Sequence, residues 1–160
     1  MNERVYKSFN DQVQAEFYSA YLYLAMSMYM AGKNFKGMAH WLYKQYEEER
    51  EHALKLVHFM QERGAAPVML EIAQPPTEFG TPLELFQKVL EHEKYVTSRI
   101  HAMYEVAAAE KDYAAVIHLQ WFVSEQVEEE DNAGEIVAKL EMVGNHLGGI
   151  LAVDRELAGR

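Results

Sequence analysis

Four stretches of about thirty residues each carry apolar side chains at alternating steps of four and three, and this repeat constrains the fold more than any other feature. Such spacing lines up apolar side chains along one side of an α-helix, whereas a half-buried strand requires strict alternation. We call the four stripes seams, and their members are Phe9, Val13, Glu16, Ala20, Tyr23, Ser27, Met30; Met38, Leu42, Gln45, Glu49, His52, Leu56, Phe59; Phe86, Val89, Glu93, Val96, Ile100, Met103, Ala107; and Leu119, Phe122, Gln126, Glu129, Ala133, Ile136, Leu140, Val143. The sequence therefore predicts an all-α bundle of four long helices.

Glycine, proline and threonine residues mark where these helices begin and end. Gly32 and Gly64 follow the first two, and Thr81 with Pro82 supplies a cap and a first residue for the third. The expected helices cover residues 2–30, 35–63, 82–110 and 113–143, with a short fifth helix over 150–158 after Gly144, Gly148 and Gly149. The long link before the third helix holds three prolines and crosses the bundle, so the third helix should run parallel to the second. We expect one domain over residues 1–160.

Composition narrows the chemistry and the partners. The 160-residue chain has no cysteine, which leaves His, Asp and Glu as metal ligands and fits a reducing, cytoplasmic location. A formal net charge of −10 argues against nucleic acid as a partner. The most apolar stretch, Phe17–Ala31, is shorter than the roughly 20 residues that span a bilayer, so we expect a buried helix and no membrane segment.

The seams are apolar except at mid-length, where they carry polar residues of the types that bind metals: Glu16, Gln45, Glu49, His52, Glu93, Gln126 and Glu129. An isolated buried carboxylate is strongly unfavourable unless it is neutralised. No lysine or arginine occupies a nearby seam position. Divalent metal ions are the simplest compensation, so the sequence predicts a metal centre inside the bundle.

The spacing of these residues indicates a duplicated helical hairpin. Each half has one Glu on its first helix and an i, i+3 pair on its second, and the intervals of 33 and 36 residues recur: Glu16 with Glu49 and His52, then Glu93 with Gln126 and Glu129. The two halves are offset by 77 residues throughout. Carboxylate-bridged di-metal bundles use this arrangement.

Two metal sites follow from the two halves. Site A would contain Glu16, Glu49 and His52, and site B would contain Glu49 as a bridge with Glu93 and Glu129, and Gln126 as a weak neutral contact. Because site B has no imidazole, it should bind metal more loosely than site A. A loose second site suits an ion that moves on after oxidation.

Further side chains near the seams carry alternative interpretations. Glu48, Glu125 and Glu128 could form a third, external iron site, and a solvated acidic face is the equally weighted alternative. Tyr23 and Trp121 could each donate an electron during oxygen reduction, or only pack in the core. Surface or packing roles are expected for the remaining histidines: His40, His58, His92, His101, His118 and His146.

Four motifs carry a family resemblance: Asn10-x-x-x-x-x-Glu16-x-Tyr18-Ser19, Glu48-Glu49-x-x-His52, His92-Glu93, and Leu119-Gln120-Trp121-Phe122-Val123-Ser124-Glu125-Gln126-Val127-Glu128-Glu129-Glu130. With them the chain resembles bacterial non-haem ferritins over essentially its whole length. The resemblance implies a ferroxidase centre at sites A and B that oxidises Fe(II) with oxygen or hydrogen peroxide. It also implies a shell of 24 identical subunits that stores a ferric mineral, and a third iron site at Glu48, Glu125 and Glu128.

The sequence departs from two related patterns. Animal ferritins place carboxylates at their threefold pores, where this chain has Val116 and Leu119, and the route of iron entry stays open. Bacterioferritins carry a second Glu-x-x-His motif and a haem-ligating methionine; the matching residues here are Gln126-x-x-Glu129 and Arg50. No haem is expected.

Two other functions compete with iron storage. A soluble di-iron oxidase or peroxidase without storage would use the same centre, but rubrerythrin-like peroxidases usually add a cysteine-ligated iron domain and this chain has no cysteine. A metal-free interaction module would leave the mid-seam carboxylates unexplained. The stretch Phe17–Ala31 is apolar on nearly every face, which favours a two-fold contact between subunits.

Overall fold

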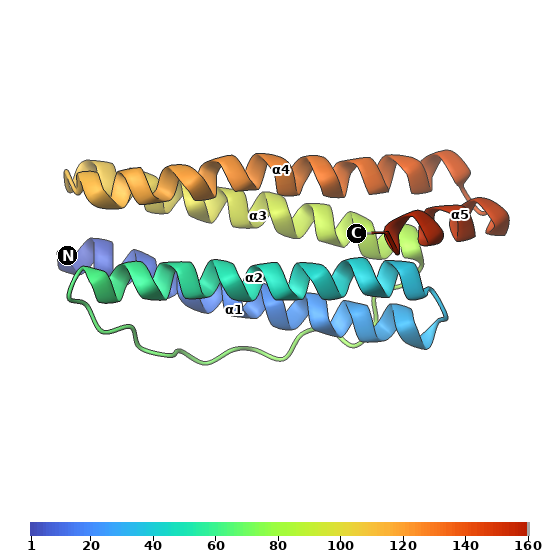
Figure 1. The fold of residues 1–160 in the computed structure, drawn as a ribbon, viewed down its shortest axis with the longest axis horizontal. Coiled ribbons are helices and arrows are strands. Elements are labelled where there is room, and N and C mark those ends of the chain that lie inside the picture. The colour runs from blue at the N-terminus through green and yellow to red at the C-terminus, as the bar shows by residue number, and fades with distance from the viewer. Residues whose placement is uncertain (160) are drawn as a thin grey trace.

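The computed structural model describes residues 1–159 and contains, within that range, five α-helices and no strand. The helices are α1 (Glu3–Gly32), α2 (Lys36–Glu62), α3 (Pro82–Ala109), α4 (Tyr113–Val143) and α5 (Leu147–Leu157). The predicted all-α bundle with a short fifth helix is confirmed (Figure 1). Arg160, the last residue of the predicted domain, lies outside the described residues.

The four long helices form two antiparallel hairpins, α1 with α2 and α3 with α4 (Figure 1). The link over residues 63–81 runs the length of the bundle, so α3 starts at the end where α2 starts and runs parallel to it. This confirms the predicted long crossover. In Figure 1, α5 lies at the end of the bundle where α4 finishes, beside the first turns of α2.

Side chains of α1 hold the crossover against the bundle. The Tyr6 hydroxyl donates to the carbonyl of Ala66 at 2.9 Å. One turn later, Asn10 Nδ2 donates to the carbonyl of Val68 at 3.0 Å, and the Val68 amide donates back to Asn10 Oδ1 at 2.7 Å. These bonds satisfy backbone groups that no helix or sheet partner serves, and they fix the extended path of the link.

Two helix boundaries differ from the predictions. The first helix continues through Gly32, and the chain turns at Asn34, which has a φ of +65°. The fifth helix begins at Leu147 and not at Ile150, because the His146 ring accepts a hydrogen bond from the Gly149 amide at 3.0 Å and caps an earlier first turn. Gly148 and Gly149 therefore lie inside α5.

Apolar residues form two clusters along the bundle. One cluster, near the end where α2 begins, includes Met30, Leu42 and Phe86. The other, near the end where α1 begins, includes Phe9 and Leu119. Across residues 1–159, none of the helices is both long enough and apolar enough to traverse a membrane.

Candidate metal centre

All four long helices place polar seam residues between the two apolar clusters. Each of these side chains is buried, with at most 6 % of the residue exposed: Glu16, Gln45, Glu49, His52, Glu93, Gln126 and Glu129. The seam pattern requires this, because a residue that continues an apolar stripe faces the same interior as its neighbours. Seven polar residues therefore share one layer of the core.

The residues predicted for site A lie together. Ligand atoms of Glu16, Glu49 and His52 fall within 4.8 Å of one another, which is close enough for one metal ion. Glu16 Oε2 and both carboxylate oxygens of Glu49 are buried and have no hydrogen-bond partner among the described residues. His52 Nδ1 lies 3.6 Å from Glu49 Oε2, beyond hydrogen-bonding distance. Buried acceptors without donors are rare in folded proteins, and a bound cation would satisfy these.

Electrostatics within this layer also favours a cation. Burial, followed by the nearby charge of Glu93 and Glu16, raises the pKa of the Glu49 carboxyl well above its usual value of 4.5. Burial likewise raises the pKa of Glu93 to about 7, while hydrogen bonds from Tyr23 and Gln126 oppose the shift. Without a cation, these carboxyl groups must hold protons near neutral pH. A metal ion would displace those protons.

Glu93, predicted for site B, is held on several sides. The buried Tyr23 hydroxyl donates to Glu93 Oε1. Gln126 Nε2 donates to Glu93 Oε2 at 3.2 Å, so the amide of Gln126 acts here as a donor. Burial, then the charges of Glu93 and Glu49, raise the pKa of the Tyr23 phenol well above 10.0, so this phenol keeps its proton.

Glu129, also predicted for site B, lies in a second group. Ligand atoms of His52, Glu125 and Glu129 fall within 4.8 Å of one another. Gln45 Nε2 donates to Glu129 Oε2 at 2.8 Å and fixes that carboxylate from the second helix. His52 belongs to both groups, and its Nε2 lies 3.8 Å from Glu125 Oε1. The imidazole therefore stands between the core carboxylates and the surface.

The surface next to His52 is hollow. A pocket of about 490 Å³ between α2 and α4 is lined by acidic side chains and a few others: Glu47, Glu48, Glu51, His52, Leu54, Lys55, His58, Trp121 and Glu125. Two of the three residues predicted for the external site, Glu48 and Glu125, line this pocket, whereas Glu128 is exposed and is not part of its lining. Trp121 packs edge-on against the His52 ring at 5.3 Å and carries Lys55 Nζ over its face at 3.7 Å.

Two polar residues behind Glu16 were missed in the sequence. Gln12 Nε2 donates to Glu16 Oε1 at 2.8 Å, and Arg99 Nε on α3 donates to Gln12 Oε1 at 2.9 Å. These two hydrogen bonds hold the Glu16 carboxylate through Oε1 and leave Oε2 available to a metal ion. Gln12 stands four residues before Glu16 on the same helix face, a spacing that could have revealed it. Arg99 gave no such signal, because its contact depends on how α1 packs against α3.

His92, which precedes Glu93, packs among aromatic side chains as expected. Its Nε2 lies 2.7 Å from Ser19 Oγ, and Tyr23 meets the ring edge-on with centroids 6.1 Å apart. Burial lowers the pKa of His92 to about 4, so the ring is neutral.

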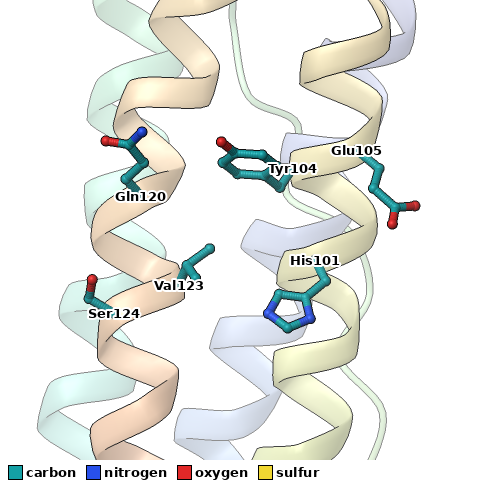
Figure 2. A pocket seen from close by; sticks show the side chains of 6 residues that line it. All are labelled: His101, Tyr104, Glu105, Gln120, Val123 and Ser124. Atoms are coloured by element: carbon teal, nitrogen blue, oxygen red, sulfur yellow. The ribbon is translucent and has the colours of Figure 1, made fainter.

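A separate pocket of about 540 Å³ opens between α3 and α4 and contains none of the seven buried polar seam residues. Its lining is His101, Tyr104, Glu105, Gln120, Val123 and Ser124. Figure 2 shows Tyr104 and Val123 pointing into the space between the two helices, while Glu105 points away. The lining of this pocket contains one histidine and one carboxylate that points away, which is a poor set of ligands for a metal ion.

Known proteins with the same organisation are ferritins. A family model described as a ferritin-like domain matches residues 6–143. A bacterial non-heme ferritin of Bacteroides fragilis is 41% identical over 160 residues, covering 100% of this chain and 99% of that protein. Another, from Campylobacter jejuni, is 35% identical over 155 residues, covering 97% of this chain and 93% of its own length.

A solved structure agrees with these sequence matches. The open pore ferritin of the hyperthermophilic archaeon Archaeoglobus fulgidus superimposes with a TM-score of 0.99 at 43% identity, covering 100% of this chain and 99% of that one. The bundle and its crossover thus have a counterpart in a solved structure. By sequence and by fold, the chain belongs to the ferritin family.

Proposed function

We propose that this protein takes up Fe(II), oxidises it at the buried carboxylate layer and stores the ferric product inside a shell of identical subunits. One observation carries the proposal. Glu16 and Glu49 present three buried carboxylate oxygens without hydrogen-bond partners among the described residues, next to the imidazole of His52. Hard oxygen donors with one imidazole suit iron in both of its oxidation states.

In this proposal the centre binds two Fe(II) ions. The first takes Glu16, Glu49 and His52. The second takes Glu49 as a bridge with Glu93 and Glu129, while Gln126 contributes a neutral contact. Two Fe(II) ions and one O₂ with two protons give two Fe(III) ions and one hydrogen peroxide, so each iron supplies one electron.

The residues around the metal ligands have distinct tasks. Gln12 presents Glu16, and Gln45 presents Glu129, each through a 2.8 Å hydrogen bond. Tyr23 holds Glu93 by donating to Oε1. Carboxylates bind the harder ferric ion more strongly than the ferrous ion, and this difference favours oxidation.

The ferric product would leave by way of the acidic pocket beside His52. Glu48 and Glu125 line that pocket within reach of the centre, and Glu128 stands exposed nearby on α4. They are the residues we propose for a third iron site. Water then hydrolyses the ferric ions, and mineral forms on an acidic inner surface of the shell. We propose 24 subunits, as the family resemblance implies, and a cytoplasmic location, which fits the absence of cysteine.

One assay separates storage from the two competing functions. Fe(II) is added in air to the purified protein, and ferric absorbance is followed together with particle size. Hundreds of irons retained in each large particle support storage. A few irons for each chain, with no further uptake, support a soluble di-iron oxidase. No oxidation above the protein-free rate supports a metal-free module and refutes the proposal.

A further inference from the structure

We propose that Tyr95, His92 and Tyr23 form a path along which an electron from a small reductant in solution reaches the iron centre. This proposal rests on the proposed oxidation of Fe(II). It assigns a role to a surface tyrosine and to a histidine that bind no metal. Three observations carry it: a phenol at the centre, an unbroken run of rings, and a pocket where the run meets solvent.

The inner end of the path is Tyr23. Its hydroxyl donates a hydrogen bond to Glu93 Oε1, so the phenol lies against a proposed iron ligand. A phenol that loses an electron must also release its proton. The carboxylate oxygen that accepts this hydrogen bond is in place to receive it.

The middle of the path is His92. The Tyr23 and His92 rings meet edge-on with centroids 6.1 Å apart and an interplanar angle of 86°. On the other side, the His92 and Tyr95 centroids are 6.4 Å apart. Both centroid separations fall in the range of neighbouring aromatic pairs in proteins. The rate of electron tunnelling falls steeply with the distance between groups. His92, which lies between the Tyr23 and Tyr95 rings, therefore serves as a bridge.

The outer end of the path is Tyr95, which is 54% exposed. Tyr95 and His92 both line a surface pocket of about 310 Å³ between α1, α3 and the crossover. Arg99 Nη1 donates to the Tyr95 hydroxyl oxygen at 3.2 Å, and this bond fixes the phenol at the rim. Lys88 and Glu91 bring one charge of each sign to the same lining, and the space suits a small hydroxylated reductant such as an enediol.

The path matters when only one Fe(II) occupies the centre and hydrogen peroxide arrives. Reduction of peroxide to two waters takes two electrons and two protons, and one Fe(II) supplies only one electron. Tyr23 supplies the second electron and passes its proton to Glu93, and two protons come from solvent, which leaves Fe(III), a Tyr23 radical, a proton on Glu93 and two waters. An electron from Tyr95 then restores Tyr23 with the proton held on Glu93, while Tyr95 releases its own proton to solvent. An enediol in the pocket gives one hydrogen atom to the Tyr95 radical.

The experiment measures the lifetime of the tyrosyl radical. Protein is loaded without oxygen with one Fe(II) for each subunit and mixed with one equivalent of hydrogen peroxide, with or without ascorbate. Rapid-freeze electron paramagnetic resonance follows the radical. The rate of ferric formation at two Fe(II) for each subunit is measured in every variant as the reference.

Tyr95→Phe is the test variant and Tyr104→Phe is its matched control. Tyr104 lies on the same helix but lines the other pocket, between α3 and α4 (Figure 2). We expect ascorbate to shorten the radical lifetime severalfold in the wild type and in Tyr104→Phe. Tyr95→Phe should lose most of this acceleration relative to the reference rate, and Tyr23→Phe should form no radical.

Two outcomes would overturn the path. Equal acceleration by ascorbate in Tyr95→Phe and Tyr104→Phe would show that electrons enter elsewhere. A wild type that oxidises two Fe(II) normally but forms no radical at one Fe(II) would remove the path and leave the proposed function intact. A wild type that oxidises no Fe(II) at all would instead refute the proposed function.

Discussion

Glu49 combines two properties that rarely occur in one side chain. It is fully buried, and neither of its carboxylate oxygens has a hydrogen-bond partner among the described residues. A carboxylate in that setting must be protonated or paired with a cation. Its neighbour His52 lies beside the core carboxylates and also lines a surface pocket. In the proposed centre His52 would therefore supply a nitrogen ligand to an ion bound at Glu49.

Replacing His52 by alanine tests that role. We expect His52→Ala to slow initial Fe(II) oxidation by more than the roughly 10–100-fold that is typical of changes to outer-shell residues, because a direct ligand is lost. The measurement is ferric absorbance in the first seconds after mixing. Particle size should stay that of the wild type.

His58→Ala is the matched control. His58 is an exposed histidine on the same helix that lines the same pocket. It should oxidise iron at the wild-type rate. An unchanged initial rate in His52→Ala would exclude His52 from the centre.

The raised pKa of Glu93 predicts how stability depends on pH. The folded, metal-free protein holds a proton on Glu93 up to about pH 7, whereas the unfolded chain releases it near 4.5. The folded state therefore binds more protons between these values, and its stability falls as pH rises through that window. The loss from this group is on the order of 3 kcal/mol by pH 8.

Urea unfolding of the metal-free protein at pH 5 and pH 8 measures this effect. Glu93→Gln keeps the shape of the side chain but has no titratable proton, so the stability of this variant should change less between the two pH values. Fe(II), added without oxygen at pH 8, should restore stability to the wild type because a ligand that binds only the folded state stabilises it. A wild type that is more stable at pH 8 than at pH 5 without metal would contradict the sign.

The sequence was sufficient to find the residues of the polar layer but not all of their partners. A seam position determines that Glu16 or Glu93 faces inward, since the helical period fixes the face. It does not determine which oxygen is free. Gln12 and Arg99 settle that for Glu16, and Arg99 comes from another helix. The second group of His52, Glu125 and Glu129 likewise depends on the relative rotation of α2 and α4.

At the scale of elements, α5 completes the start of α2. The residue before that helix, Phe35, makes no capping hydrogen bond with its side chain. Asp154 of α5 supplies the cap instead, because its Oδ1 accepts from the Met38 amide at 2.8 Å. Gly37 permits this close approach, since an added Cβ would stand 1.6 Å from the Asp154 carbonyl oxygen.

Asp154→Ala should therefore weaken two helices at once. Loss of a capping carboxylate costs about 0.5–2 kcal/mol, and we expect a loss of that size in the free energy of unfolding. Amide hydrogen exchange should quicken in the first turn of α2 and throughout α5. Asp154→Asn keeps an acceptor oxygen and should retain most of the stability. Equal losses in both variants would mean that charge, and not the hydrogen bond, matters.

The ends of helices were predicted less well than their existence. The long apolar repeats determine four helices, because each buries a continuous stripe. The start of α5 depends on hydrogen bonds to His146, whose ring accepts from the Gly149 amide and whose carbonyl accepts from the Gly149 and Ile150 amides, and the glycines in the first turn suggested a break instead. The cap at His146 outweighs the low helix propensity of the glycines and sets the start of α5.

At the scale of the whole molecule, the second half of α1 exposes large apolar side chains. Met28 is 68% exposed and Tyr21 is 49% exposed, and both line a hollow with Pro75 and Pro76 of the crossover. Large apolar side chains exposed close together are typical of surfaces that contact another protein, and we expect such a contact here. A second copy of the chain is the partner that the proposed shell requires.

Met28→Glu should prevent assembly while leaving each bundle folded. A carboxylate at that position would be desolvated in a contact between subunits, which is strongly unfavourable without a partner charge. Light scattering should give small oligomers in place of large particles, with helix content unchanged by circular dichroism. Met28→Leu keeps the surface apolar and should assemble as the wild type does. Large particles formed by Met28→Glu would place the subunit contact elsewhere.

The 77-residue offset between the two sets of polar seam residues has a consequence for how the chain matures. Glu16, Glu49 and His52 belong to the first hairpin, and Glu93 and Glu129 belong to the second. Each hairpin is local in the chain and can form early, whereas their docking must close the long crossover. An ion that takes ligands from both hairpins stabilises only the arrangement in which the two hairpins are docked. In the proposed centre this applies to the second ion, because the first takes all its ligands from one hairpin. Newly made subunits that bind the second iron would thereby be selected for correct docking, which would act as a proofreading step.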